Sequence, residues 1–258
     1  MKRLFARYLL FVVSFMSAAH CLTHEDDYRF YVKLDSGISV AQLPNILAPV
    51  SAWNESLQGY NSPLGHTAIA GLSVGCEFFE VLDLEVSISN RSVFEYRAFQ
   101  IPMTGAGSYT REFDLSVTPI LFSANILGRG IPHLHWDFNE SKIYPMIGCS
   151  VGMSNLLITN FRTTGLPATG DSYPYNSFSS ENQYTLVKNF TYALRLGFEY
   201  SHTDRWAIGT GYRWLHAGNF AGPQYLRVAD GAAVDIAPDQ WQMRFQANEW
   251  FIEFKIFI

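Results

Sequence analysis

Two groups of polar residues have the types and spacing that chemistry requires. His133, His135 and Asp137 occupy every second position, so on an extended strand all three side chains would share one face and could bind a metal ion. Asp83 and Glu85 share a strand face in the same way, and a pair of carboxylates can carry out acid–base catalysis. We interpret the histidines as part of an exposed polar connection and the carboxylates as part of a salt-bridge network. The sequence therefore predicts no metal site, no cofactor and no catalytic centre.

The elements that position these residues are segments in which apolar and polar side chains alternate. A period of two is typical of a β-strand that separates an apolar medium from a polar one. It is clearest in residues 250–258, where one face carries Glu253 and Lys255. The other face is apolar throughout: Trp250, Ile252, Phe254, Ile256 and Ile258. We expect eight strands, at about 28–41, 67–78, 82–96, 112–124, 142–154, 186–200, 206–215 and 241–258.

The connections between these strands alternate between short and long. An even number of strands, with short turns at one end and long loops at the other, is the pattern of outer-membrane proteins. We predict an all-β fold, an eight-stranded antiparallel up-and-down transmembrane β-barrel with long extracellular loops. Residues 125–141 are too many for a short turn, so either the flanking strands are longer or the turn is elaborated. In the last strand the alternation changes phase near Ala247 and Asn248, which predicts a β-bulge.

The N-terminal residues predict export. Lys2, Arg3 and Arg7 precede an apolar stretch at residues 9–16, and small residues follow at 17–19. We interpret residues 1–21 as a cleaved signal peptide and residues 22–258 as a barrel domain in the bacterial outer membrane. Loss of the three positive charges takes the formal net charge from −5 to −8, which argues against a nucleic-acid partner. Aromatic residues make up 16% of the chain, as aromatic girdles require.

The polar faces decide what kind of barrel this is. In the fourth strand we expect Phe113, Leu115 and Val117 to face lipid, with Asp114 inside. Over all strands, the charged residues that we place inside are Arg29, Lys33, Asp35, Glu77, Asp83, Glu85, Arg91, Asp114, Arg195, Glu199, Arg213, Glu249, Glu253 and Lys255. Eight strands leave just enough room for side chains, and unpaired buried charge is costly. We therefore predict a paired network that plugs the lumen. A soluble lipocalin-type barrel would instead place its charges outside.

Several segments, taken in order, resemble a known family. They are residues 30–34 (FYVKL), 82–86 (LDLEV), 144–152 (YPMIGCSVG), 211–214 (GYRW) and the terminal strand. The chain resembles the eight-stranded opacity/OmpA-type outer-membrane β-barrel proteins, which include bacterial surface antigens, over nearly all of its mature length. The resemblance implies a non-catalytic role in envelope structure, adhesion or ligand binding. It also implies that the alternating apolar residues of the last strand, Trp250 to Ile258, form a signal for the barrel-assembly machinery.

One stretch also resembles part of an enzyme family. Residues 212–219 (YRWLHAGN) are similar to the His-x-Ser-Asn stretch of outer-membrane lipid A deacylases, and His216 and Asn219 match it. Where that family has its nucleophile this chain has Gly218, so His216 has no hydroxyl to activate. Asp230 and Asp235 could orient an imidazole but cannot replace the nucleophile. We predict that the protein is not an enzyme, and we keep a lipid A-modifying enzyme and a small channel as alternatives.

The long loops are the remaining candidates for function, because recognition commonly lies in loops on a rigid scaffold. The third long connection, residues 155–189, mixes aromatic residues with Ser, Thr, Asn and Gly, a composition suited to contact surfaces. Its candidate contact residues are Phe161, Tyr173, Tyr175, Phe178 and Tyr184. The partners that we expect are outer-membrane lipid and lipopolysaccharide, the barrel-assembly machinery, and a host or environmental ligand at the loops.

Overall fold

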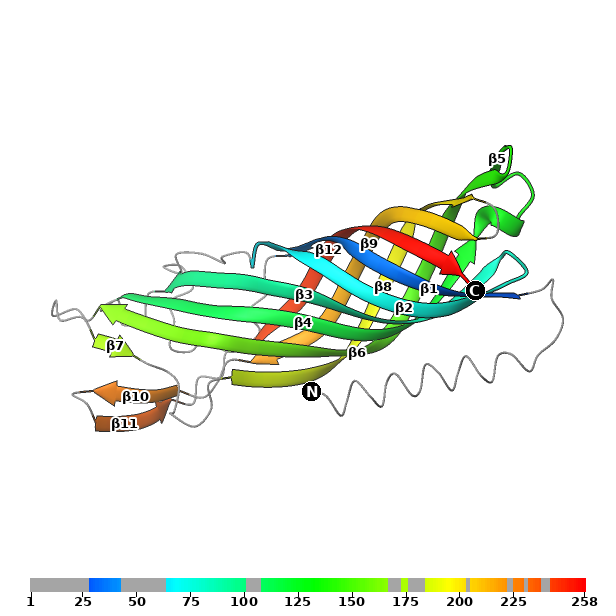
Figure 1. Cartoon of the computed structure of the whole chain (residues 1–258). Helices are drawn as coiled ribbons and strands as arrows, with labels where there is room; N and C mark the ends of the chain where they lie inside the picture. The colour runs from blue at the N-terminus through cyan, green and yellow to red at the C-terminus, as the bar shows by residue number, and fades with distance from the viewer. Residues whose placement is uncertain are drawn as a thin grey trace.

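The computed structural model describes residues 28–42, 64–100, 108–166, 173–175, 184–202, 205–221, 225–229, 232–237 and 242–258. Eight long strands dominate these residues (Figure 1). They are β1 (Tyr28–Ala41), β2 (His66–Phe78), β3 (Leu82–Gln100), β4 (Ser108–Leu127), β6 (Ser141–Leu166), β8 (Tyr184–His202), β9 (Trp206–Ala221) and β12 (Gln242–Phe257). No helix in this part of the chain is long and apolar enough to cross a membrane.

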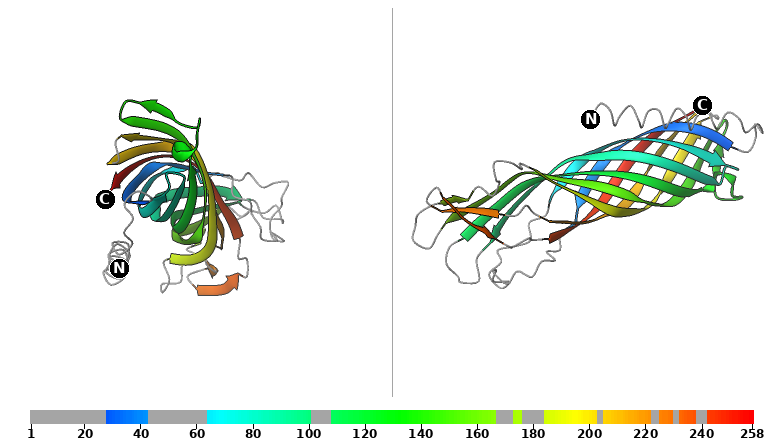
Figure 2. Two further views of the ribbon diagram at one scale, coloured as in Figure 1. Left: turned by 90° about the vertical axis from the view of Figure 1, so that its right-hand side faces the viewer. Right: turned by 90° about the horizontal axis from the view of Figure 1, so that it is seen from below.

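The eight long strands form a closed barrel. Each pairs antiparallel with the next long strand along the chain, and β1 pairs with β12 from Tyr31 opposite Phe257 to Ala41 opposite Ala247. The strands tilt around a common axis in all the views (Figure 2). Closure leaves no sheet edge within the barrel wall, which is what a β-structure in lipid requires. The predicted eight-stranded antiparallel up-and-down barrel is confirmed.

The outer surface of the barrel carries a continuous apolar belt. Trp250, Ile252 and Phe254 of β12 point outward, and the side chain of Trp250 is 65% exposed. Other strands add exposed residues: Leu34, Ile38, Leu72, Val86, Ile88, Phe122, Ile147, Val151, Leu194, Leu196, Phe198 and Ile208. An apolar surface of this extent is not stable in water, so the belt marks the wall that contacts lipid.

The long connection at residues 125–141 is elaborated, and β4 also runs further than expected. The strand β4 ends at Leu127, and a short 3-10 helix, η2 (Gly128–Gly130), follows it. The strand β5 (Trp136–Phe138) then forms a hairpin with the start of β6. Both of the outcomes that the sequence left open are therefore present, and Figure 1 shows the β5 hairpin projecting from the end of the barrel.

At the opposite end, three strands extend beyond the barrel wall. Figure 2 shows β3, β4 and β6 continuing together past the ends of their neighbours. The short strand β7 (Tyr173–Tyr175) pairs with β6, and β10 (Tyr225–Ala229) pairs with β11 (Ala232–Ala237) in a separate two-stranded sheet. This end carries the long connections, which the strand pattern assigns to the cell exterior. We refer to it as the outer end, and to the end with η2 as the inner end.

The face assignment of β4 predicted from sequence is wrong. Phe113, Leu115 and Val117 point into the barrel and are buried, whereas Asp114 lies on the outer surface. There its carboxylate accepts a hydrogen bond of 2.6 Å from the side-chain amide of Asn160. The prediction assumed that apolar side chains face lipid along the whole strand. It fails because the outer half of the lumen is itself apolar. In this part of β4 the apolar side chains therefore face the lumen and the polar ones face outward.

The bulge predicted in the last strand is not in that strand. Inward and outward residues alternate without interruption along β12, because Met243, Phe245 and Ala247 are buried in the barrel interior. The irregularity lies in the neighbouring β9, where Phe245 is opposite Gly218 and Gln246 is opposite His216. One residue of β9 therefore has no residue opposite it in β12, which is a β-bulge. Next to it, Gly218 has a positive φ of 82°, a conformation that favours glycine.

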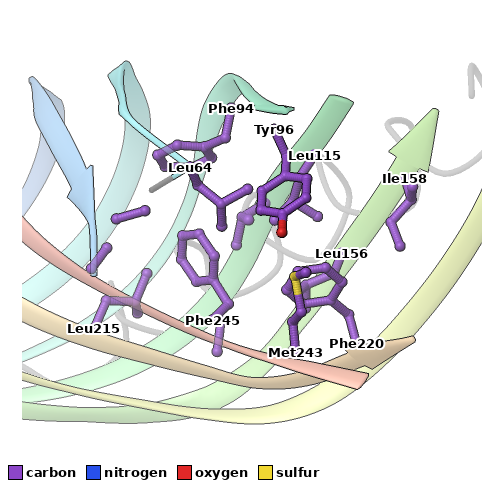
Figure 3. Packing of buried hydrophobic residues seen from close by; sticks show 14 of the residues in the cluster. Leu64, Phe94, Tyr96, Leu115, Leu156, Ile158, Leu215, Phe220, Met243 and Phe245 are labelled. Carbon is purple, nitrogen blue, oxygen red and sulfur yellow. The ribbon is translucent and has the colours of Figure 1, made fainter. Parts of the chain in front are cut away.

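A cluster of apolar side chains fills the outer half of the lumen (Figure 3). Phe94, Phe113 and Phe245 are buried, with ring centroids of Phe94 and Phe245 5.2 Å apart. Tyr96 stacks on Phe113 at 4.6 Å. The rest of the cluster comprises Ala41, Leu64, Leu115, Val117, Leu121, Leu156, Ile158, Ala193, Leu215, Ala217, Phe220, Met243 and Ala247. The sequence had predicted a polar lumen and did not reveal this apolar layer.

Candidate functional site

The outermost part of the charged network centres on Glu249 of β12. Arg91 binds both carboxylate oxygens of Glu249, through Nε and Nη2 at 2.7 Å each. Arg213 donates from Nε to the same carboxylate at 2.6 Å and from Nη1 to Asp35 at 3.1 Å. Ser39 donates a further hydrogen bond of 2.9 Å to Glu249. Both Arg91 and Glu249 have 0% exposure, so each charge depends on its partner for solvation.

A second layer of paired charges lies closer to the inner end, around Glu253. Arg195 donates from Nη2 to both oxygens of Glu253 at 2.8 Å, and Lys33 lies 2.9 Å from the same carboxylate. Lys33 also pairs with Glu85 of β3. The ring of Phe251 lies under the Arg195 guanidinium, with 4.8 Å to the ring centroid, a cation–π contact that separates this layer from the one above.

The third layer is built around Lys255, whose ammonium is fully enclosed. Its Nζ lies 2.8 Å from Glu77 and 2.8 Å from Glu199, and 3.6 Å from Asp83. Arg29, which is partly exposed at the inner end, makes a second ion pair with Glu77. The three carboxylates come from β2, β3 and β8, so one lysine holds together strands on opposite sides of the barrel.

Two buried tyrosines donate hydrogen bonds to carboxylates of these layers. Tyr31 donates hydrogen bonds to Asp83 at 2.6 Å and to Glu85 at 3.1 Å, and so links the second and third layers. Tyr144 donates to Glu199 at 2.5 Å. The Tyr31 ring lies over Gly75, where a Cβ atom would come within 2.3 Å of the tyrosine hydroxyl. Glycine at this position is therefore required by the space that the ring occupies.

The elaborated inner turn adds a charge to the inner end of the lumen. Arg129 of η2 is buried and donates to the inward-facing Ser201 of β8 at 3.1 Å. Its guanidinium also lies 3.2 Å from Glu80 in the turn between β2 and β3. Sequence reasoning missed Arg129 because it lies in a connection, where no alternation indicates which way a side chain points.

The structure brings together on the inner face all the charged residues predicted for the lumen except Asp114. Eight-stranded walls leave little free volume, and here the contents change from apolar at the outer end to paired charges at the inner end. Chemically, this arrangement holds strands together through ion pairs between side chains of different strands. Each carboxylate of the three layers is engaged by a cation or a hydroxyl.

The other candidate residues are dispersed. His135 lies 3.6 Å from Asp137, and among the described residues no group of three or more His, Cys, Asp or Glu could hold a metal ion. His216 faces outward, with its ring stacked on Tyr192 at 4.6 Å. The backbone carbonyl of Asn219 accepts a hydrogen bond from Asn189. Asp235 is in β11, and Asp230 lies outside the described residues.

The predicted loop contacts and targeting segments are only partly described. Phe161 belongs to β6 and Tyr184 begins β8. In β7, Tyr173 is opposite Gly165 and Tyr175 is opposite Thr163 of β6. Phe178 and the predicted signal peptide, residues 1–21, lie outside the described residues. The residues of the proposed assembly signal are exposed, four on the outer face of β12 and Ile258 directly after it: Trp250, Ile252, Phe254, Ile256 and Ile258.

No protein-family model and no curated protein sequence matches this chain. Solved structures of similar fold include Neisserial surface protein A, which is 13% identical, with 88% of this chain and 96% of that chain covered and a TM-score of 0.44. The outer membrane protein OprG from Pseudomonas aeruginosa is also 13% identical, with 90% and 97% covered and a TM-score of 0.44. Ail of Yersinia pestis is 9% identical, with 90% and 99% covered and a TM-score of 0.38.

The closed barrel, its apolar outer belt and its filled interior together define a class of protein. The fold is that of an eight-stranded antiparallel transmembrane β-barrel.

Proposed function

We propose that the protein is a non-catalytic surface protein of the bacterial outer membrane, with a closed barrel as scaffold and its outer end as the contact region. The observation that carries this proposal is the filled lumen. The apolar cluster around Phe94 and Phe245 lies above three layers of paired charges. An ion crossing the barrel would have to displace both, so the scaffold role is favoured over a channel.

The filled lumen is tested by recording currents from the purified full chain in planar lipid bilayers. We expect no steady single-channel conductance. The matched comparison is a variant that removes side chains at both levels, Phe245→Ala with Arg91→Ala, and heat-dependent gel mobility would verify that it folds. Steady conductance of the unaltered protein would overturn the closed scaffold and favour the channel.

The contact role of the outer end is tested by shortening the third long connection. Deletion of residues 176–183 is made with a Gly/Ser linker of about four residues in their place, because Tyr175 lies opposite Thr163 and Tyr184 opposite Thr159 of β6, a span that a direct bond could not bridge. Cells that display the full chain and cells that display the deletion are compared for binding to host cells and matrix components. We expect the deletion to abolish the binding that the full chain confers. Equal binding by both would exclude this loop as the contact region.

An unchanged lipid A mass spectrum on expression is also expected, since Gly218 supplies no nucleophile. A new lipid A species that depends on His216 would contradict the non-catalytic proposal. The His216→Phe variant keeps an aromatic ring against Tyr192, so it separates loss of chemistry from loss of packing.

A further inference from the structure

The outer wall formed by β8, β9 and β12 changes character in regular steps towards the outer end. Strand register places side chains of the three strands in rows on this face. From the middle of the belt outward, the rows are Leu196, Tyr212 and Trp250; then Leu194, Trp214 and Asn248; then Tyr192, His216 and Gln246. The innermost row is therefore apolar and aromatic, the next row includes one amide, and the outermost row carries a phenol, an imidazole and an amide.

The aromatic rows are held rigidly by contacts along the wall. Tyr192 stacks on His216 at 4.6 Å and meets Trp214 edge-on at 5.7 Å. Tyr212 packs against Trp250 at 5.5 Å and donates a hydrogen bond of 2.6 Å to Asn248. Aromatic residues with polar edges occur where lipid chains meet headgroups. These rows therefore mark the depth of the outer headgroup layer.

Two basic side chains lie beyond these rows, and on β8 the exposed Phe190 lies between Tyr192 and the basic residue. Arg244 of β12 is opposite Asn219 of β9, beyond the row of His216 and Gln246. Lys188 of β8 is exposed and lies opposite Asn155 of β6. The described parts of β8, β9 and β12 contain three acids, Glu199, Glu249 and Glu253, all buried in the lumen. The outward face of these strands thus carries positive charge without compensating acids.

The opposite wall differs at a comparable level. The outer parts of β3 and β4 present Glu95, Glu112 and Asp114 on the outer surface, with Arg97 paired to Glu112 at 2.9 Å. The charge around the barrel is therefore segregated, basic over β8, β9 and β12 and acidic over β3 and β4. Headgroup anions would be attracted to the first wall and repelled from the second.

We infer that the outer wall of β8, β9 and β12 is a binding site for a phosphorylated glycolipid of the outer leaflet. In this site Arg244 and Lys188 bind phosphate, and the row of Tyr192, His216 and Gln246 contacts the sugar. Leu194, Leu196 and the apolar belt below them contact the acyl chains. Arginine pairs strongly with phosphate oxygens, and the site is continuous with the apolar belt, so acyl chains and headgroup can be bound together. This inference rests on the proposed outer-membrane location.

The experiment measures lipid binding to the purified full chain in detergent by native mass spectrometry. The probes are lipid A with its two phosphates and the same lipid with its phosphates removed. The test variant is Lys188→Gln with Arg244→Gln. The control is Lys142→Gln with Arg205→Gln, which removes the same charge at the inner end; Lys142 lies 3.6 Å from Glu80, and neither side chain belongs to the three layers of the lumen. Gel mobility before and after heating shows that each protein is folded.

We expect the unaltered chain to bind phosphorylated lipid A more tightly than the dephosphorylated form. The test variant should lose this preference, with affinity for the phosphorylated lipid reduced about thirtyfold, whereas the control should retain it. Equal losses of affinity for phosphorylated lipid A in the test and control variants would show that only the net charge of the protein matters. That result would overturn the site. Equal binding of both lipids by the unaltered chain would overturn it as well. The binding assay uses purified protein in detergent, so its result does not depend on where the protein is located in the cell. The proposed outer-membrane location is tested separately, by cell fractionation.

Discussion

The two halves of the lumen are both filled by side chains, but the side chains differ in chemical type. The outer half is filled by apolar side chains such as Phe94, Phe245 and Met243, whereas the inner half is filled by ion pairs around Glu249, Glu253 and Lys255. Apolar packing depends mainly on volume, while buried ion pairs depend on the presence of every partner. The inner half should therefore be sensitive to substitutions that preserve shape, and the outer half should tolerate them.

The largest effect is expected for Glu249→Gln, which preserves shape and removes one charge. Two buried guanidinium groups, Arg91 and Arg213, would lose their shared carboxylate. Breaking a buried ion pair on one side costs about 3–5 kcal/mol, so the free energy of unfolding should fall by that amount. Urea unfolding in detergent, followed by tryptophan fluorescence, measures it. A loss below about 1 kcal/mol would show that water reaches this layer.

A smaller loss is expected for Gly75→Ala. The added methyl group would come within 2.3 Å of the Tyr31 hydroxyl and 2.7 Å of the Leu84 carbonyl oxygen. Overpacking of this kind costs about 1–3 kcal/mol. In a Tyr31→Leu background most of the clash is removed, so the same glycine substitution should cost less there. Equal costs in both backgrounds would mean that the ring does not determine the need for glycine.

In the apolar half, Met243→Leu should have little effect. Met243 is buried among apolar neighbours and has no ionic partner, and volume-conserving apolar changes cost less than about 1.5 kcal/mol. The same urea experiment measures it beside Glu249→Gln. If the two variants were equally destabilised, the contrast between the halves would be lost.

The smallest effect is expected outside the lumen, for Glu112→Gln. Glu112 pairs with Arg97, whose side chain is 75% exposed. Exposed ion pairs contribute up to about 1 kcal/mol, so unfolding should change by no more than that. Because this variant makes the same chemical change as Glu249→Gln, a comparable loss of stability would indicate that burial is not what makes the inner pairs important.

The strands could be predicted from sequence because apolar and polar side chains alternate along a strand whether the apolar face contacts lipid or the lumen. Lys33, Arg195 and Glu253 were placed on the inner face on this basis, and the structure has them there. Alternation identifies two faces but does not say which is inward. In β4 the apolar face is the inner one, so Asp114 was assigned to the wrong side.

Other features depend on contacts between segments far apart in sequence. Arg129 reaches the inner end of the lumen from a turn, where the sequence has no period to indicate its direction. The apolar cluster requires β3, β4, β6, β9 and β12 together, and each strand alone resembles one with a lipid-facing side. The chemistry of the lumen therefore became visible only once the barrel was closed.

The central claim is that the apolar faces contact lipid and the charged faces lie inside a closed barrel. Outer-membrane and soluble fractions of expressing cells, run on SDS gels with and without boiling, test it most directly. We predict that the protein is in the outer-membrane fraction and migrates differently when unboiled, because a folded barrel with a paired interior resists the detergent. A protein found in the soluble periplasmic fraction, with the same mobility boiled and unboiled, would contradict the claim.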